Sequence, residues 1–198
     1  MATERNGTIG DKMQKRKVIL YDWASPCGRL TIGDAEGKLV VVDWTDGWHH
    51  RTVMNRIARR AEADFEVGTT PLIERTVREL NEYFAGRRRE FDLPLVFYGT
   101  DFQVKVWQAL QCIPYGHWVT YGDIAREAGS PKAVRAVGVA VGENPFSIIV
   151  PCHRVVGKDK TLTGYGGGYA AKRKILALEM GVPEEAIGFE DGAQKHGH

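Results

Sequence analysis

The stretch "VRAVGVAVGENPFSIIVPCHRVVG", Val134 to Gly157, carries most of the information about the fold. Its first part repeats valine at helical spacing, and its last part is β-branched and apolar around Pro151 and Cys152. Asn144 and Pro145 mark a turn between the two parts. The stretch therefore predicts a helix, a turn, and a buried strand that contains a cysteine.

The helix, predicted over 132–142, has two different faces. Val134, Val137 and Val141 form a stripe that we expect to face the core. The opposite face carries one long cation among small residues, namely Arg135, Ala136, Gly138, Ala140 and Gly142. Glycine inside a helix costs about 1 kcal/mol relative to alanine, so something must approach this face closely. Another helix of the same chain and a nucleic-acid groove both remain possible.

The segment "TYGDIAREAG" predicts a short helix, with Thr120 as a cap. "AGSP" joins this helix to the one predicted over 132–142, for which Ser130 is a second possible cap. Two short helices joined by a tight, glycine-bearing turn suggest a helix-turn-helix. A closing helix, "YAAKRKILALEMG", ends at Gly181. These segments indicate a mostly helical C-terminal unit.

The N-terminal half shows a different pattern. "KVILYDWAS", "GRLTIGDAE" and "GKLVVVDWTD" predict a small antiparallel sheet, and a helix follows from Thr70 and Pro71 to a stop at Gly86. The extended segment "GRRREFDLPLVFYGT" places a boundary near Gly99. We therefore predict an α/β (α+β) fold with a sheet domain over 17–98, a helical domain over 99–182, and tails over 1–16 and 183–198.

Charge and hydropathy limit the function classes. The whole chain carries a formal net charge of +2, whereas residues 99–182 have ten Lys/Arg against six Asp/Glu, which suits a polyanionic partner. No run of 18 apolar residues occurs, and the first residues do not resemble a signal peptide. We expect a cytoplasmic, monomeric protein with no membrane partner.

The three cysteines are widely spaced, which argues against a disulfide framework or a four-cysteine zinc site. We expect Cys27 and Cys112 to be small buried hydrophobes. Cys152 is equally well explained as a buried structural residue or as a reactive thiol. His153 is a possible base, but adjacent side chains in a strand point to opposite faces, so contact needs a turn at Pro151 or a bridging water. Glu179 is the candidate acid to orient that histidine.

The string "PCHRVVG", with "RAVGVAVGENP" before it and "GYGGGYAAKRKILALE" after it, resembles the active-site region of the O6-alkylguanine-DNA alkyltransferases. The match is dense from Phe102 to Gly181. Over the N-terminal half only "SPCGRLTIG" resembles the family's early strand pair, and the resemblance implies a ribonuclease H-like domain there. It also implies direct-reversal DNA repair, in which the alkyl group of O6-alkylguanine moves irreversibly to Cys152 in a single turnover. O4-methylthymine is a possible second substrate.

The resemblance implies a role for each matching position. Cys152 would be the acceptor, His153 its base through a water, and Glu179 the residue that holds His153. Tyr121 would hydrogen-bond the leaving guanine, and Lys172 matches a family lysine near the thiol. The remaining positions would bind DNA in its minor groove around a flipped nucleotide or shape the base pocket: Arg135, Ala136, Gly138, Asn144, Tyr165, Gly166 and Gly167.

The implied partner is double-stranded DNA containing alkylated guanine, and no cofactor is implied. Some relatives carry zinc in the N-terminal half, but Cys27, His49 and His50 cannot be aligned to that site, so we predict no metal. Three other functions make different demands on the sequence. An alkyltransferase-like damage binder would lack the acceptor cysteine, a cysteine hydrolase would turn over repeatedly, and a helix-turn-helix regulator would need no thiol.

Overall fold

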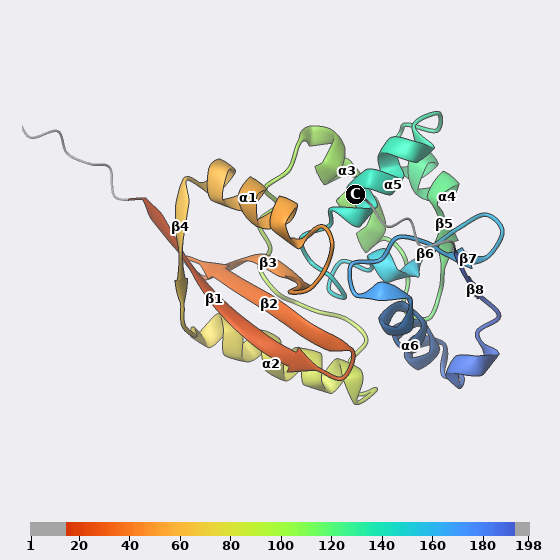
Figure 1. Ribbon diagram of the computed structural model, residues 1–198, viewed down its shortest axis with the longest axis horizontal. Coiled ribbons are helices and arrows are strands. Elements are labelled where there is room, and N and C mark those ends of the chain that lie inside the picture. Colours follow the sequence, from red (N-terminus) through yellow and green to blue (C-terminus); the bar gives the residue numbers. More distant parts are fainter. Residues whose placement is uncertain (1–14, 193–198) are drawn as a thin grey trace, which may run out of the picture.

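A four-stranded sheet forms the centre of the N-terminal half in the computed structural model, which describes residues 15–192 (Figure 1). Strands β1 (Arg16–Ser25), β2 (Gly28–Ala35) and β3 (Lys38–Trp44) pair antiparallel, as predicted. A fourth strand, β4 (Ala63–Val67), pairs parallel with β1 and gives the order β3-β2-β1-β4. The expectation of an antiparallel sheet was therefore wrong for β4, which returns to the sheet through a helical crossover.

That crossover is helix α1 (His50–Ala61), which the sequence analysis missed. Its N-cap residue makes no side-chain cap bond, and its C-cap is Glu62 in a left-handed conformation instead of a glycine. Val53 and Ile57 pack with Val41 against one face of the sheet. The sequence thus lacks the usual signals of a helix start and end, namely a capping side chain and a terminal glycine, and the buried face of the helix holds few apolar residues. These are the reasons why the helix was not predicted.

Helix α2 (Pro71–Phe84) covers the opposite face of the sheet and begins as predicted. The Thr70 hydroxyl accepts a hydrogen bond from the Ile73 amide at 3.2 Å, and Pro71 occupies the first turn. Ile73, Leu80 and Tyr83 are fully buried. Their side chains belong to the largest apolar cluster, which continues into the C-terminal half.

The C-terminal half is mostly helical. It contains α3 (Asp101–Gln111), β5 (Val119–Thr120), α4 (Tyr121–Glu127), α5 (Val134–Gly142), the 3₁₀ turn η1 (Cys152–Arg154), β6 (Val155–Val156), β7 (Thr161–Leu162) and α6 (Gly168–Met180). Helices α4 and α5 form the predicted helix-turn-helix. Thr120 caps α4 in a capping box with Asp123.

Two corrections concern the end of the chain and the cysteines. Residues 183–192 contain η2 (Glu184–Ala186) and β8 (Glu190–Asp191), and Ile187 and Phe189 are buried, so this part of the expected tail is folded. The expected tail over 1–16 falls almost wholly outside the described residues, although β1 already begins at Arg16. Cys112 is exposed and Cys27 half-buried, so the expectation that both are buried was wrong.

Among the residues that the structure describes, no helix is long and apolar enough to cross a membrane.

Candidate active site

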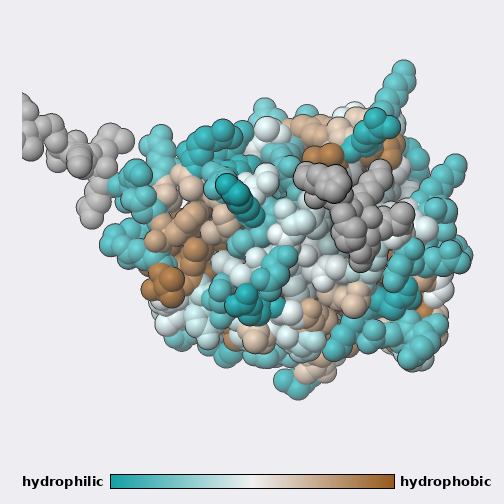
Figure 2. Space-filling model, in the orientation of Figure 1, coloured by the Kyte–Doolittle hydropathy of each residue, from teal (hydrophilic) through white to brown (hydrophobic). Residues whose placement is uncertain are grey.

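Helix α5 presents an exposed face that differs slightly from the predicted one. Val137 and Val141 are buried as expected, but Val134 is 40 % exposed because it is the first residue of the helix and projects away from the core. Arg135, Ala136 and Val139 are exposed as well. Figure 2 shows apolar surface gathered over α5. The face therefore combines small and apolar side chains with one long cation.

The glycines of α5 have different neighbours. A Cβ on Gly142 would lie 2.7 Å from Nε2 of His49, so the ring of this buried histidine occupies the space beside that glycine. A Cβ on Gly138 would meet the Tyr121 ring at 3.8 Å, an ordinary contact. Packing within the chain thus explains Gly142, while Gly138 lies over Tyr121, the first residue of α4.

The loop from α5 to the cysteine is held on two sides. Asn144 is buried; its Oδ1 accepts from the Phe146 amide at 3.0 Å, and its Nδ2 donates to the Val150 carbonyl at 2.8 Å. On the other side, Val42 of β3 exchanges backbone hydrogen bonds with Pro145 and Ser147, at 2.8 and 2.6 Å. The edge of the N-terminal sheet therefore fixes the approach to Cys152.

Ile148 lies within this loop with φ = 72° and is almost completely buried. A positive φ is unfavourable for a β-branched residue because its Cβ crowds the backbone. Such conformations persist only where the surroundings impose them, and here the Asn144 and β3 contacts do so. The loop geometry is thus imposed by its neighbours and not by local preference.

Cys152 is the first residue of η1 and is 7 % exposed. It was expected in a strand; the chain instead makes the turn that Pro151 allows, before β6 begins. Burial raises the pKa of the Cys152 thiol to about 11, although the Asn144 hydrogen bond and the Lys172 charge favour the thiolate. The resting thiol is therefore protonated at neutral pH.

Two charged groups lie near this thiol and shift its pKa in opposite directions. Lys172 of α6 is fully buried, and its Nζ donates to the carbonyls of Val155 and Thr163 at 2.6 and 3.1 Å. Burial lowers the pKa of Lys172 to about 8. Asp43 accepts from the Ser147 hydroxyl at 3.3 Å, and its negative charge opposes ionisation of Cys152.

His153 points to a buried carboxylate. Its Nε2 lies 2.9 Å from Oε1 of Glu179, and its Nδ1 is buried with no hydrogen-bond partner among the described residues. Burial lowers the pKa of His153, so the ring is neutral at pH 7. Because an ionised carboxylate only accepts, the proton sits on Nε2, and Nδ1 carries a free lone pair. Such a nitrogen can take up a proton.

Glu179 receives further donors that the sequence analysis did not identify. Arg154 donates from Nε to Oε2 and from Nη2 to Oε1, each at 2.8 Å, and the Tyr83 hydroxyl donates to Oε1 at 2.6 Å. The Gly116 amide donates to Oε2 at 3.3 Å. Burial alone would raise the pKa of Glu179, but His153 and Arg154 together hold it well below its usual range. Glu179 is therefore ionised.

Three of the predicted base-pocket residues, Tyr165, Gly166 and Gly167, lie against Trp44. The Tyr121 hydroxyl accepts from Thr163 Oγ1 at 3.0 Å, and burial raises its pKa. Tyr165 is buried and packs edge-on to Trp44 at 5.8 Å between ring centroids. A Cβ on Gly167 would lie 2.6 Å from the Trp44 ring, and one on Gly166 would lie 3.2 Å from it. Trp44 thus requires glycine at 167 and leaves little room at 166.

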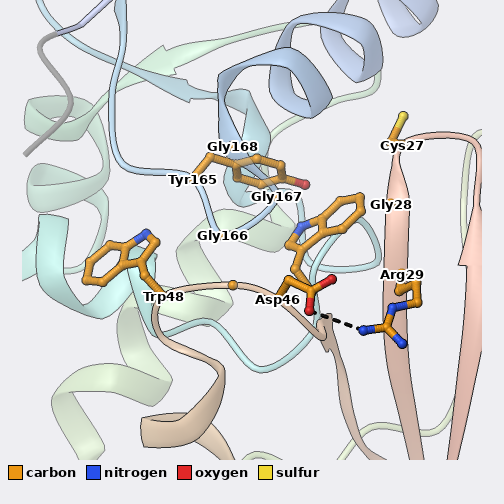
Figure 3. Close-up of a pocket in the computed structure, with 11 residues that line it drawn as sticks. Cys27, Gly28, Arg29, Asp46, Trp48, Tyr165, Gly166, Gly167 and Gly168 are labelled. Atoms are coloured by element: carbon orange, nitrogen blue, oxygen red, sulfur yellow. Dashed lines mark hydrogen bonds and ion pairs between the residues drawn. The ribbon is translucent and has the colours of Figure 1, made fainter. Parts of the chain in front are cut away.

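A hollow of about 420 Å³ lies beside Trp44, Gly166 and Gly167 (Figure 3). Trp48 and Tyr165 line one part of it, and the Arg29–Asp46 ion pair, at 3.2 Å, lines another. Cys152 does not line it. Among the described residues, no group of three or more His, Cys, Asp or Glu side chains is arranged to hold a metal ion.

Cys152, His153 and Glu179 stand out in the sequence as candidates, whereas Tyr83, Arg154, Asp43 and Trp44 were not predicted there. Arg154 lies within the quoted string "PCHRVVG", where its spacing from Cys152 could have flagged it. Tyr83 is separated from Glu179 by 96 positions, so no local pattern connects the two. The site is therefore completed by residues from the N-terminal half.

Comparison with family models matches both halves of the chain. Residues 101–181 match the DNA-binding domain of 6-O-methylguanine DNA methyltransferase, and residues 18–97 match the ribonuclease-like domain of the same family. The constitutive methylated-DNA–protein-cysteine methyltransferase of Bacillus subtilis is 44 % identical over 172 residues, which are 84 % of this chain and 94 % of that protein.

Mycobacterial relatives match this chain in sequence over a shorter region, and their crystal structures match its fold. The methylated-DNA–protein-cysteine methyltransferase of Mycobacterium tuberculosis is 58 % identical over 103 residues, so the alignment spans 52 % of this chain and only 62 % of that relative. A crystal structure of the M. tuberculosis O6-methylguanine methyltransferase superposes with a TM-score of 0.70 at 42 % identity, over 84 % of this chain and 94 % of that one. A structure of it in complex with DNA gives a TM-score of 0.69 at 42 % identity, over 84 % and 95 %.

Proposed function

Because the chain belongs to the 6-O-methylguanine DNA methyltransferase family, we propose that it repairs DNA by transferring the alkyl group of O6-alkylguanine to its own Cys152. The observation that carries the proposal is the buried Cys152 thiol beside a neutral His153, whose Nε2 faces Glu179 and whose Nδ1 has a free lone pair. A protonated thiol needs such a base, because only the thiolate attacks carbon efficiently.

The proposed chemical step is a single displacement. As the thiol proton passes through a water to Nδ1 of His153, the sulfur attacks the alkyl carbon of the guanine. The carbon–O6 bond breaks, its electron pair stays on the guanine, and Tyr121 hydrogen-bonds the base as it leaves. A proton from solvent then restores neutral guanine, and the imidazolium of His153 releases its proton to solvent, so that charge and protons balance. The product is a thioether, and nothing in this scheme cleaves it, so each molecule reacts once.

DNA binding in this proposal uses the exposed face of α5 in the minor groove. The alkylated atom of guanine lies inside the duplex, so the nucleotide must rotate out, at a cost of a few kcal/mol. Arg135 would fill the space it leaves, while Ala136 and Gly138 allow close approach to the groove. Asn144, Tyr165, Gly166 and Gly167 would shape the base pocket, with Lys172 favouring the thiolate.

The remaining expectations belong to the same proposal. The chain would act as a monomer in the cytoplasm on alkylated double-stranded DNA, with a sheet domain over 17–98 and a DNA-binding domain over 99–182. O4-methylthymine would react in the same way, because its methyl group also sits on an exocyclic oxygen.

Intact mass measurement tests the proposal. After incubation with a duplex containing O6-methylguanine, we expect one methyl group per chain, mapped to Cys152, and no gain in Cys152→Ser. A parallel duplex with O4-methylthymine tests the second substrate. Repeated turnover without an adduct would indicate a cysteine hydrolase instead, and tight DNA binding without any adduct would indicate a non-catalytic damage binder.

A further inference from the structure

Tyr83 of α2 and His153 of η1 donate hydrogen bonds to the same carboxylate oxygen. The distances to Oε1 of Glu179 are 2.6 Å from the tyrosine hydroxyl and 2.9 Å from Nε2 of the histidine. All three side chains are nearly or completely buried. Because hydrogen bonds are stronger in a buried, low-dielectric environment, each donor reduces the negative charge that the other one meets.

The other donors to the Glu179 carboxylate come from the C-terminal half of the chain. Arg154 spans both carboxylate oxygens, and the Gly116 amide reaches Oε2. Oε1 thus receives three donors, more than the two lone pairs of such an oxygen accommodate well. Removing one of the three would therefore strengthen the remaining two.

Packing holds the Tyr83 ring firmly in place. Phe84 and Phe91 lie 5.5 Å from it, and Tyr115 lies 6.2 Å from it, measured between ring centroids. Burial and the Glu179 charge raise the pKa of Tyr83 well above its usual value, so the hydroxyl remains a donor throughout the physiological range. Tyr83, in the N-terminal half, thus donates to the carboxylate of Glu179, which lies in the C-terminal half and faces His153.

We propose that Tyr83 is a positioning residue that limits the basicity of His153 by sharing Oε1 of Glu179 with it. This inference rests on the proposed function, in which neutral His153 accepts the thiol proton. With Tyr83 present, Glu179 stabilises the protonated form of His153 less strongly. His153 therefore stays neutral, and able to accept a proton, down to a lower pH. The titratable and charged groups around His153 and Glu179 are Tyr83, Tyr115, Arg154, Tyr165 and Lys172, and Arg89 lies over the Tyr115 ring.

The test is Tyr83→Phe, which keeps the ring and removes the hydroxyl. The single-turnover rate constant of methyl transfer is measured at saturating protein across the pH range, together with affinity for the same duplex. The rate falls as pH drops through the pKa of His153, because the protonated ring accepts no proton. In Y83F we expect this acid limb to move to higher pH by about one unit, with affinity for DNA unchanged.

Tyr115→Phe is the matched control. It removes a hydroxyl from the same aromatic cluster, and among the described contacts that hydroxyl makes no hydrogen bond to Glu179. Its acid limb should coincide with that of the wild type. An unshifted profile in Y83F, or an equal shift in both variants, would overturn the proposal.

Nuclear magnetic resonance separates this inference from the proposed function. The pKa of His153, followed through its ring resonances, should rise in Y83F even if the wild type transfers no methyl group. If Y83F does not fold, exchange of the Tyr83 hydroxyl proton in the wild type tests the proposal. A slowly exchanging hydroxyl proton on Tyr83 supports the shared oxygen, whereas rapid exchange of that proton contradicts it.

Discussion

Cys152 combines a position suited to reaction with a resting state that is unreactive. Its thiol is buried, and burial raises its pKa to about 11. An ordinary cysteine has a pKa near 8.5, so the thiolate fraction at neutral pH is lower here by roughly two orders of magnitude. The Cys152 thiol therefore stays protonated at neutral pH until a base takes its proton.

We predict that iodoacetamide distinguishes the cysteines at neutral pH. Exposed Cys112 should be alkylated readily, while Cys152 should react far more slowly because it is both buried and protonated. Peptide mass spectrometry over a time course measures both rates. In denaturant the two rates should become similar, and fast labelling of Cys152 in the folded protein would contradict the raised pKa.

Helix α1 holds the C-terminal end of α5, the helix that faces DNA in the proposed function. Arg56 of α1 is buried, and its Nη1 lies 3.0 Å from Oε2 of Glu143, the C-cap residue of α5. Its Nη2 also donates to the Glu143 carbonyl at 2.8 Å, and its guanidinium lies over the Trp107 ring. A cation at a helix C-terminus interacts favourably with the helix dipole.

We predict that Arg56→Met destabilises the fold by about 3 kcal/mol, because it leaves the largely buried Glu143 carboxylate without its ionic partner. Affinity for duplex DNA should also fall, since the end of α5 loses its anchor. Denaturant unfolding and DNA titration measure the two effects. Arg60→Met, on the exposed side of the same helix, is the control and should leave both nearly unchanged.

The elements that could be predicted from sequence are those with strong local signals. Thr70 with Pro71, and Thr120, gave correct helix starts because a cap acts within one turn. Ser130 was wrong as a cap, since α5 has Ala133 at its N-cap with no side-chain cap bond. Helix α1 lacks such signals and derives its stability from packing on β3. Cys152 and His153 were found from a short string, whereas Tyr83 reaches Glu179 only through tertiary folding, which no local pattern encodes.

At the scale of the whole molecule, the two halves share one apolar core. Leu80 and Tyr83 from the N-terminal half belong to the same cluster as Trp107, Phe146 and Ile175 from the C-terminal half. The edge of β3 also pairs with the loop that leads to Cys152. Neither half can therefore be removed without exposing apolar surface and unpaired backbone of the other.

We predict that the full chain unfolds in one cooperative transition. Tryptophan fluorescence reports on both halves, because Trp44 and Trp107 are buried in them, and its midpoint should coincide with that of far-ultraviolet circular dichroism. A fragment over 99–192 should show no cooperative transition, since it loses the sheet edge and the α2 face. Two separate transitions in the full chain would contradict a shared core.

The carboxylate of Glu179 also carries a consequence for how the protein is made. Its donors come from α2, from Gly116 and from η1, whereas Glu179 itself lies in α6, near the end of the described residues. A ribosome synthesises the chain from its N-terminus, so Tyr83, His153 and Arg154 all emerge before their common acceptor exists. Until Glu179 arrives, the proton on His153 is free to occupy either nitrogen, and Arg154 has no counter-charge. Under the proposed mechanism, the capacity to react is therefore gained late in synthesis, in the step that docks α6 onto segments already made.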